Sequence, residues 1–117
     1  DVDWVQRDLA EAHARGEAMK LLNWRMAAAV AEGTLTPADA SAAKVFGVET
    51  QIAMYRLMLS VLGAVGYLPE GSPGAVLRGD VERNGRAAQI NTFGGGVVEV
   101  LREIVATTGL GMVRQAR

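Results

Sequence analysis

Three consecutive glycines, Gly94 to Gly96, are the feature of this sequence most typical of a binding site. They stand in "INTFGGGVVEVLREIVA", residues 90–106, directly before a helical pattern. Glycine is used where a chain turns tightly or where something must approach the backbone. The free N–H groups at the start of the next helix suit an anionic or carbonyl-bearing ligand, whereas Glu99 already places a negative charge in the first turn. Local chemistry therefore supports two interpretations equally, a structural loop and a ligand-binding loop.

A second glycine element, "GAVG" at residues 63–66, superficially resembles a phosphate-binding loop. It follows a helical pattern instead of a strand, and it lacks the spacing of both the dinucleotide and the P-loop motifs. Local chemistry favours a plainer interpretation, in which Gly63 ends the preceding helix in a left-handed conformation.

The remaining reactive side chains do not form a catalytic or metal-binding pattern. His13 is the only histidine and lies among Glu11, Arg15 and Glu17 on a polar helix face, so we assign it no role. No pair of glutamates or Glu-x-x-His pattern suggests a metal site within a helical bundle. The chain has no cysteine, which excludes disulfides and thiolate chemistry and fits a cytoplasmic location.

Composition narrows the class of protein further. The chain has 117 residues, enough for one domain with a single core. Twelve Lys plus Arg against thirteen Asp plus Glu leave no basic surface for nucleic acid or an anionic membrane. The apolar stretch Met54 to Val65 is short and interrupted by Arg56, so we expect a soluble domain without a membrane span. Because the chain begins at Asp1, without a signal peptide pattern, we expect a piece of a longer protein.

Hydrophobic periodicity predicts an all-α fold, an antiparallel four-helix bundle with two long and two shorter helices. A long helix over about residues 2–32 is ended by Gly33, and a second begins at Pro37, with Thr36 as N-cap and Asp39 in its first turn. A loop of roughly ten residues begins at Gly63, and shorter helices follow at about 76–90 and 97–107. The expected core consists of Leu9, Met19, Met26, Val48, Ile52, Tyr55, Leu59, Leu62, Ile104 and Val105.

The order of several segments resembles a known family. "LAEAHARGEAMKLL" is followed by "ASAAKVFGVETQIA", "VLGAVGYL", "VERNGRAAQINTFGGG" and "EVLREIVA". Together they resemble the C-terminal helical domain of the acyl-CoA dehydrogenases over nearly the whole chain. The "TFGGG…EV" form is most similar to the actinobacterial branch that acts on CoA esters of steroids and other bulky acids.

The resemblance implies that residues 1–117 are the last domain of a flavoprotein whose N-terminal helical and middle β-domains are absent from this sequence. The family uses FAD to desaturate the Cα–Cβ bond of an acyl-CoA in β-oxidation while a carboxylate removes the α-proton. It also implies a homo- or hetero-oligomer with a related dehydrogenase subunit. Such a domain is expected to bind its partners through the long helices and to be inactive alone.

The family's site residues transfer only in part. Where the family has its catalytic glutamate before Gly-Thr, this chain has Gly95, with Gly96 and Val97 in place of Gly-Thr. We therefore assign no catalytic residue here. A second family element, which begins with glutamine and lies against the FAD of a neighbouring subunit, begins here with Ser60. The resemblance implies cofactor contacts at Ser60, Gly63, Ala64, Gly66, Gly95, Gly96, Val97 and Glu99.

Three explanations of the missing glutamate stay open. The subunit can be a supporting one that completes the site of a partner in an α2β2 assembly, or its base can lie on the helix upstream of this domain. The chain can also be a non-enzymatic helical module that only oligomerises. The loss of both the threonine and the glutamine favours the supporting subunit, because Val97 cannot form a side-chain hydrogen bond.

Overall fold

The computed structural model describes residues 2–114, and within that range every regular element is helical. The two long helices are α1 (Asp3–Glu32) and α2 (Pro37–Leu62), and the two short ones are α3 (Asp80–Ala88) and α4 (Val98–Ile104). Short 3₁₀ turns and one π-helical turn extend or connect them. These are η1 (Gly63–Tyr67), η2 (Val76–Gly79), η3 (Gln89–Thr92) and the π-helical η4 (Val105–Gly109). The prediction of an all-α fold with two long and two shorter helices is confirmed.

The turn between the long helices follows from local chemistry. Gly33 adopts the left-handed conformation at φ 68°, and its N–H donates to the last turn of α1. Thr36 then caps α2: its Oγ1 accepts from the Asp39 N–H at 3.1 Å and donates to the Asp39 carboxylate at 2.6 Å. The hydrogen bond from the Thr36 side chain holds the pKa of Asp39 below its usual value. Both predicted boundaries are therefore confirmed.

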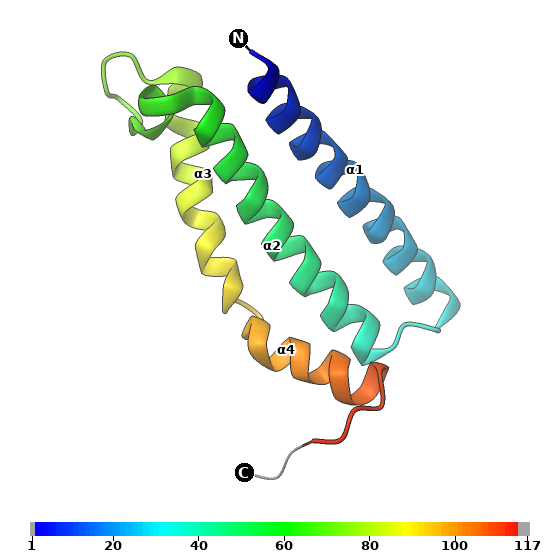
Figure 1. Ribbon diagram of the computed structural model, residues 1–117. Helices are drawn as coiled ribbons and strands as arrows, with labels where there is room; N and C mark the ends of the chain where they lie inside the picture. Colours follow the sequence, from blue (N-terminus) through cyan, green and yellow to red (C-terminus); the bar gives the residue numbers. More distant parts are fainter. Residues whose placement is uncertain (1, 115–117) are drawn as a thin grey trace.

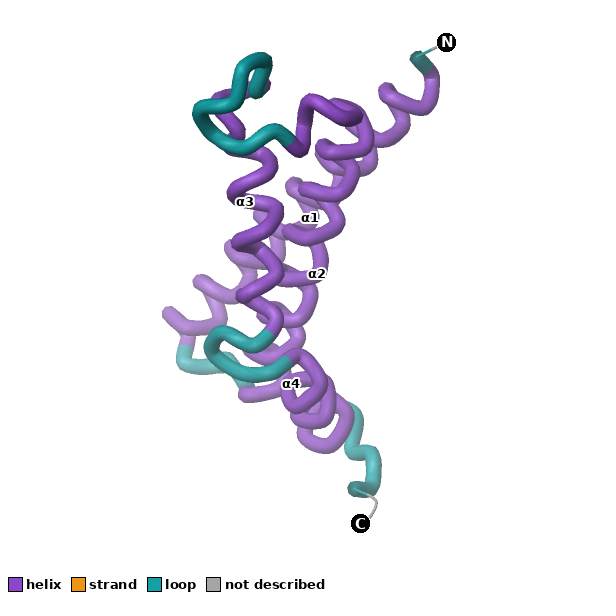
Figure 2. Tube along the Cα trace, turned by 90° about the vertical axis from the view of Figure 1, so that its left-hand side faces the viewer, coloured by secondary structure: helices purple, strands orange, loops and turns teal. Residues whose placement is uncertain are grey.

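Helix α2 is the centre of the fold. Figure 1 shows α1 antiparallel to α2 on one side, with α3 and α4 following one another along α2 on the other. The view turned by 90° shows α4 diverging at the base, where it crosses the first half of α2 (Figure 2). The described part of the chain thus has four α-helices, but α3 and α4 share one side of α2, which leaves much of α1 there without a second neighbour.

The buried core lies where α3 meets α2. Val48, Ile52 and Ala88 form a buried cluster, and Tyr55 packs against it. Gly85 allows the close approach of α3, because a Cβ at this position would lie 3.3 Å from the Cβ of Tyr55. The predicted burial of Val48 and Ile52 is confirmed.

The expected core residues differ in how deeply they are buried. All but Leu9 are buried or half-buried, whereas Leu9 is 49% exposed. The prediction for Leu9 is wrong because α1 packs mainly on α2, and the side chain lies at the edge of that contact. It instead lines an apolar cleft of about 200 Å³, together with residues from α2, η2 and α3. Outside that expected set, the buried residues include Ala12, Ser41, Thr50, Val81, Ala88 and Val98.

The segment between α2 and α3 also differs from the expectation. The predicted loop begins as the 3₁₀ turn η1, and the third helix begins at Asp80 instead of about residue 76. The reason is a left-handed turn: Leu77 and Arg78 have φ of 49° and 55°, values that an L-residue adopts only with strain. Gly79 completes the turn at φ 75°, and a helix cannot pass through it.

The α2–η1 segment, Pro37–Tyr67, is long and apolar enough to cross a bilayer by length and composition alone. The expectation that no apolar stretch has the required length is wrong on this point, because the relevant segment is longer than Met54 to Val65. The packing of α1, α3 and α4 along α2 gives a second account of this composition, since the central helix of a bundle is apolar on more than one face.

Candidate functional site

The glycine loop at residues 94–97 connects η3 to α4 and depends on its glycines. Gly95 has φ 73° and Gly96 has φ 120°, both in the region that favours glycine. A Cβ on Gly96 would lie 3.3 Å from Leu101 Cδ2, whereas a Cβ on Gly95 would meet no atom within 4 Å. The loop therefore needs glycine at position 95 for its backbone conformation and at position 96 for both conformation and packing.

Polar contacts on either side hold this loop against the middle of α2. On one side, the Asn91 amide donates to Gln51 Oε1 at 3.3 Å. On the other, the Arg102 guanidinium donates to the carboxylate of Glu49. The Gly94 N–H donates to the Ile90 carbonyl oxygen at 3.1 Å, which closes the turn. These contacts fix the position of the loop, although three of its four residues are glycines.

The surface around the loop is apolar and open. Ile90, Phe93, Val97 and Val100 are all exposed, Phe93 by 63%. We call these four residues the loop surface. Val97 is the N-cap of α4, and its side chain makes no capping hydrogen bond. Glu99 lies in the first turn of α4, as the sequence indicated, and is exposed.

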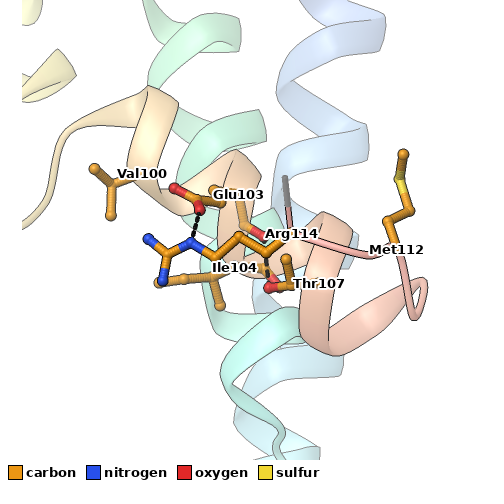
Figure 3. A pocket seen from close by; sticks show the side chains of 6 residues that line it. All are labelled: Val100, Glu103, Ile104, Thr107, Met112 and Arg114. Atoms are coloured by element: carbon orange, nitrogen blue, oxygen red, sulfur yellow. Dashed lines mark hydrogen bonds and ion pairs between the residues drawn. The ribbon is translucent and has the colours of Figure 1, made fainter. Parts of the chain in front are cut away.

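A groove along α4 continues from the loop surface at Val100. It has a volume of about 320 Å³ and is lined by Val100, Glu103, Ile104, Thr107, Met112 and Arg114. In Figure 3, the Glu103 and Arg114 side chains meet in the middle of this groove, between Val100 and Met112. Arg114 Nε lies 2.6 Å from Glu103 Oε1, and the Met112 N–H donates to the Ala106 carbonyl oxygen, so the tail folds back on α4.

The second glycine element lies at the far end of α2. Gly63 has φ 62° but ψ −148°, so it ends α2 in an extended left-hand conformation and not in the αL stop that local chemistry favoured. The chain continues directly into η1, where Gly66 is buried, with room for no side chain: its Cβ would lie 2.8 Å from Leu62 Cβ. Ser60, in the last turn of α2, and Gly63 and Ala64, at the start of η1, are exposed.

The two glycine elements do not converge within one copy of the chain. The glycine loop is fixed beside Gln51, and Ser60 lies nine residues further along α2, a rise of about 14 Å. Figure 1 shows η1 at the opposite end of α2 from α4. The structure thus brings Gly95, Gly96, Val97 and Glu99 together and, separately, Ser60, Gly63, Ala64 and Gly66.

The structure adds features that the sequence pattern did not signal. The apolar partners of the loop, Ile90 and Phe93, were not expected, because η3 breaks the helical period that would have indicated which way they point. The strained turn at Leu77 and Arg78 also carries no sequence signal, since neither residue type favours positive φ. Within residues 2–114, no group of histidine and acidic side chains is placed to hold a metal ion.

Comparison with known proteins identifies the class. Residues 1–110 match the family described as "Acyl-CoA dehydrogenase, C-terminal domain". The chain belongs to this family, and the resemblance inferred from the segment order is confirmed. The long helices, the second glycine element and the glycine loop therefore follow one another as in an acyl-CoA dehydrogenase C-terminal domain.

Two similar relatives are acyl-CoA dehydrogenases. The chain is 49% identical over 120 residues to acyl-CoA dehydrogenase FadE26 and 38% identical over 117 residues to acyl-CoA dehydrogenase FadE29, both of Mycobacterium tuberculosis. Both alignments cover all of this chain, which spans about 30% of the length of these relatives.

Two solved structures have the same fold. The "Tcur3481-Tcur3483 steroid ACAD" superposes with a TM-score of 0.93 at 54% identity, covering 97% of this chain and 29% of that chain. The ChsE4-ChsE5 complex from Mycobacterium tuberculosis superposes with a TM-score of 0.90 at 50% identity, covering 98% and 30%.

Proposed function

We propose that this domain belongs to a cytoplasmic acyl-CoA dehydrogenase that desaturates a steroid or similarly bulky acyl-CoA, and that it is a supporting subunit without the usual base. Its partner is a related dehydrogenase subunit in a hetero-oligomer. The family membership supports the reaction class. The name of one similar structure, a steroid ACAD, supports the substrate class, and the two-component names of both structures support the hetero-oligomer.

One observation carries the assignment as a supporting subunit: the backbone conformation at Gly95. Its φ of 73° is strained for any L-residue, so this loop is shaped around glycine at the place where the family has its glutamate. The neighbouring Gly96 is equally unsuited to a side chain, because Leu101 packs against it. The catalytic glutamate is thus missing at position 95, and the loop conformation at this position disfavours a glutamate.

The residues of the second glycine element fit part of an FAD site. Gly63 and Ala64 leave the backbone open for a diphosphate to approach, and Gly66 keeps the turn compact. Ser60 offers a shorter polar group where the family has an amide. FAD, when bound, accepts the two electrons released from the Cα–Cβ bond. Because this element is remote from the glycine loop, one copy contributes to two different sites, with η1 facing the cofactor of a neighbouring subunit.

The loop surface supplies what a large apolar substrate needs. Ile90, Phe93, Val97 and Val100 form an exposed apolar wall with no carboxylate among them. Such a wall excludes water from the acyl group and packs against a fused-ring or branched chain. It also explains Val97 in place of threonine, since an apolar contact replaces a polar one at this position.

The two alternatives make different predictions. A catalytically complete subunit, with its base upstream of this domain, binds one FAD per chain and loses activity when that upstream glutamate is replaced. A non-enzymatic module binds neither FAD nor acyl-CoA in any assembly. The supporting subunit, purified with its natural partner, gives about half as many flavins as subunits, all of them at the partner's catalytic sites.

The test is the flavin absorbance and turnover of the full-length complex, with Gly95→Glu as the informative variant. We expect the wild-type complex to hold about one FAD per two subunits, and Gly95→Glu to leave the number of active sites unchanged. Gly33→Glu is the matched control, because Gly33 has nearly the same φ and an open surface but lies far from the loop. One FAD per chain of this type would refute the proposal. So would a rise in the number of active sites with Gly95→Glu alone.

A further inference from the structure

The turn before α3 holds three consecutive residues in the left-handed region. Leu77, Arg78 and Gly79 have φ of 49°, 55° and 75°, with ψ of 33°, 26° and 10°. Leucine and arginine adopt this region only with strain, so a left-handed turn that contains both is unusual. Such strain persists where surrounding contacts hold it, and it is typical of segments that have two competing conformations.

Two sets of contacts hold the left-handed turn. Gly79 lies so close to the 69–70 segment that a Cβ on it would be 2.5 Å from the Glu70 backbone nitrogen. Arg83 donates to the carboxylate of Glu70 at 3.1 Å and to that of Asp80 at 2.6 Å, so it joins the 69–70 segment to the first turn of α3. The Arg83 and Glu70 side chains are more than half exposed, and exposed ion pairs contribute little to stability. The turn therefore depends mainly on the contact at Gly79.

The same residues also fit a right-handed helix. Hydrophobic periodicity predicts a helix from about residue 76, four residues before α3 begins. In a right-handed extension of α3, Leu77 would lie one turn before Val81 and continue the buried row of Val81, Gly85 and Ala88. In the left-handed turn, Leu77 is instead 65% exposed. Leucine and arginine are also good helix formers, so the extended helix would release the strain.

We propose that residues 76–79 are a two-state switch between the left-handed turn and a right-handed extension of α3. The left-handed form is the one seen in the structure. In the extended form, Gly79 turns away from the 69–70 segment and the Glu70–Arg83 ion pair opens. The Asp80–Arg83 ion pair joins residues three apart in one helix and is kept in both forms.

The switch couples two parts of this end of the bundle, because η2 contacts both η1 and α3. In the left-handed form, Leu77 lines the apolar cleft of about 200 Å³ beside Leu9 of α1. The same form holds the 69–70 segment, two residues beyond the end of η1, against Gly79. Extension of α3 changes both contacts in one step, so an event at the cleft is transmitted to η1. This coupling goes beyond the proposed function and does not depend on a flavin or on the missing base.

Amide hydrogen exchange distinguishes the two forms in the full-length protein purified with its natural partner. A helix that begins at Asp80 leaves the N–H groups of Val81 and Glu82 without acceptors inside the helix. An extended helix supplies the carbonyl oxygens of Leu77 and Arg78 as acceptors, four residues earlier in each case. In peptides spanning residues 76–83, these two amides should therefore exchange quickly in the left-handed form and slowly in the extended form.

Leu77→Pro is the deciding variant. Proline fixes φ near −65°, which excludes the left-handed turn but suits the first turn of a helix. We expect exchange of the Val81 and Glu82 amides to slow about tenfold as the extended form becomes the main one. Leu77→Ala removes the same side chain without fixing φ, so it is the matched control and should leave this exchange fast. Unchanged or faster exchange in Leu77→Pro would show that the segment has no helical alternative and would overturn the proposal.

Gly79→Ala reaches the same equilibrium through the other contact. Alanine is strained and collides with the 69–70 segment in the left-handed form, whereas it is the most favourable residue in the extended helix. We expect exchange of the same two amides to slow about three- to tenfold. Gly33→Ala is the control, since Gly33 has nearly the same φ and open surroundings, and it should have no effect on these amides.

A change of residue at position 78 then tests the hand of the turn. Added to Gly79→Ala, Arg78→Asn should restore part of the fast exchange, because asparagine tolerates the left-handed region. Arg78→Ala removes the same charge but favours the right-handed helix, so it should keep the exchange slow. Equal exchange in the two double variants would contradict a switch between left-handed and right-handed forms.

Discussion

Replacing Gly79 with alanine tests how the segment between η1 and α3 packs against Gly79. Gly79 has φ 75°, and a Cβ there would lie 2.5 Å from the backbone nitrogen of Glu70 and 2.9 Å from the carbonyl carbon of Pro69. Backbone atoms cannot move aside as the end of a flexible side chain can. The substitution therefore combines the strain of a left-handed residue with a collision against the 69–70 segment.

The magnitude follows from a matched pair of glycines. Gly33 has φ 68°, and no atom lies within 4 Å of its virtual Cβ, so Gly33→Ala introduces the conformational strain alone. That strain costs about 1–2 kcal/mol, partly offset by a less flexible unfolded chain. Gly79→Ala adds the cost of overpacking, about 1–3 kcal/mol. We expect Gly79→Ala to lower the free energy of unfolding by about 2–4 kcal/mol, and Gly33→Ala by about 1 kcal/mol.

Urea-induced unfolding followed by far-UV circular dichroism measures both variants against the parent chain. The difference between the two alanine variants isolates the contact with the 69–70 segment, because their backbone conformations are nearly equal. If Gly79→Ala cost no more than Gly33→Ala, the 69–70 segment would not pack against Gly79 as described, and the reasoning would be refuted.

Two further predictions concern the core and the cap of α2. Ile52→Ala removes a buried side chain and should cost about 2–5 kcal/mol in urea unfolding; a loss near 0.5 kcal/mol would place Ile52 outside the core. Thr36→Ala removes the cap and should cost about 0.5–2 kcal/mol at pH 7. Thr36 lowers the pKa of Asp39, so the associated stability is present above the ordinary value of 3.8 and is lost as the pH falls below it. Unfolding at pH 7 and pH 3 should therefore show a smaller effect of Thr36→Ala at pH 3, and an equal effect would contradict a role for the Asp39 carboxylate.

The sequence alone determined the features that depend on neighbours along the chain. Gly33, Thr36, Pro37 and Asp39 set the boundary between the long helices, because caps and left-handed stops act over one helical turn. The periodic spacing of Val48 and Ile52 identified the core face of α2 for the same reason. The order of the glycine elements and helices was also sufficient to indicate the family.

Tertiary structure decided the features that depend on which elements meet. Leu9 has the spacing of a core residue, but it is exposed because α3 and α4 share the far side of α2 and, among residues 2–114, no helix covers the flank of α1. The late start of α3 comes from positive φ at Leu77 and Arg78, against their intrinsic preference, directly before Gly79, which lies against the backbone of residues 69–70. The separation of η1 from the glycine loop along α2 is likewise a property of the assembled helices. Residue types and local spacing state what a segment prefers, whereas burial and proximity depend on contacts between segments that are distant in the chain.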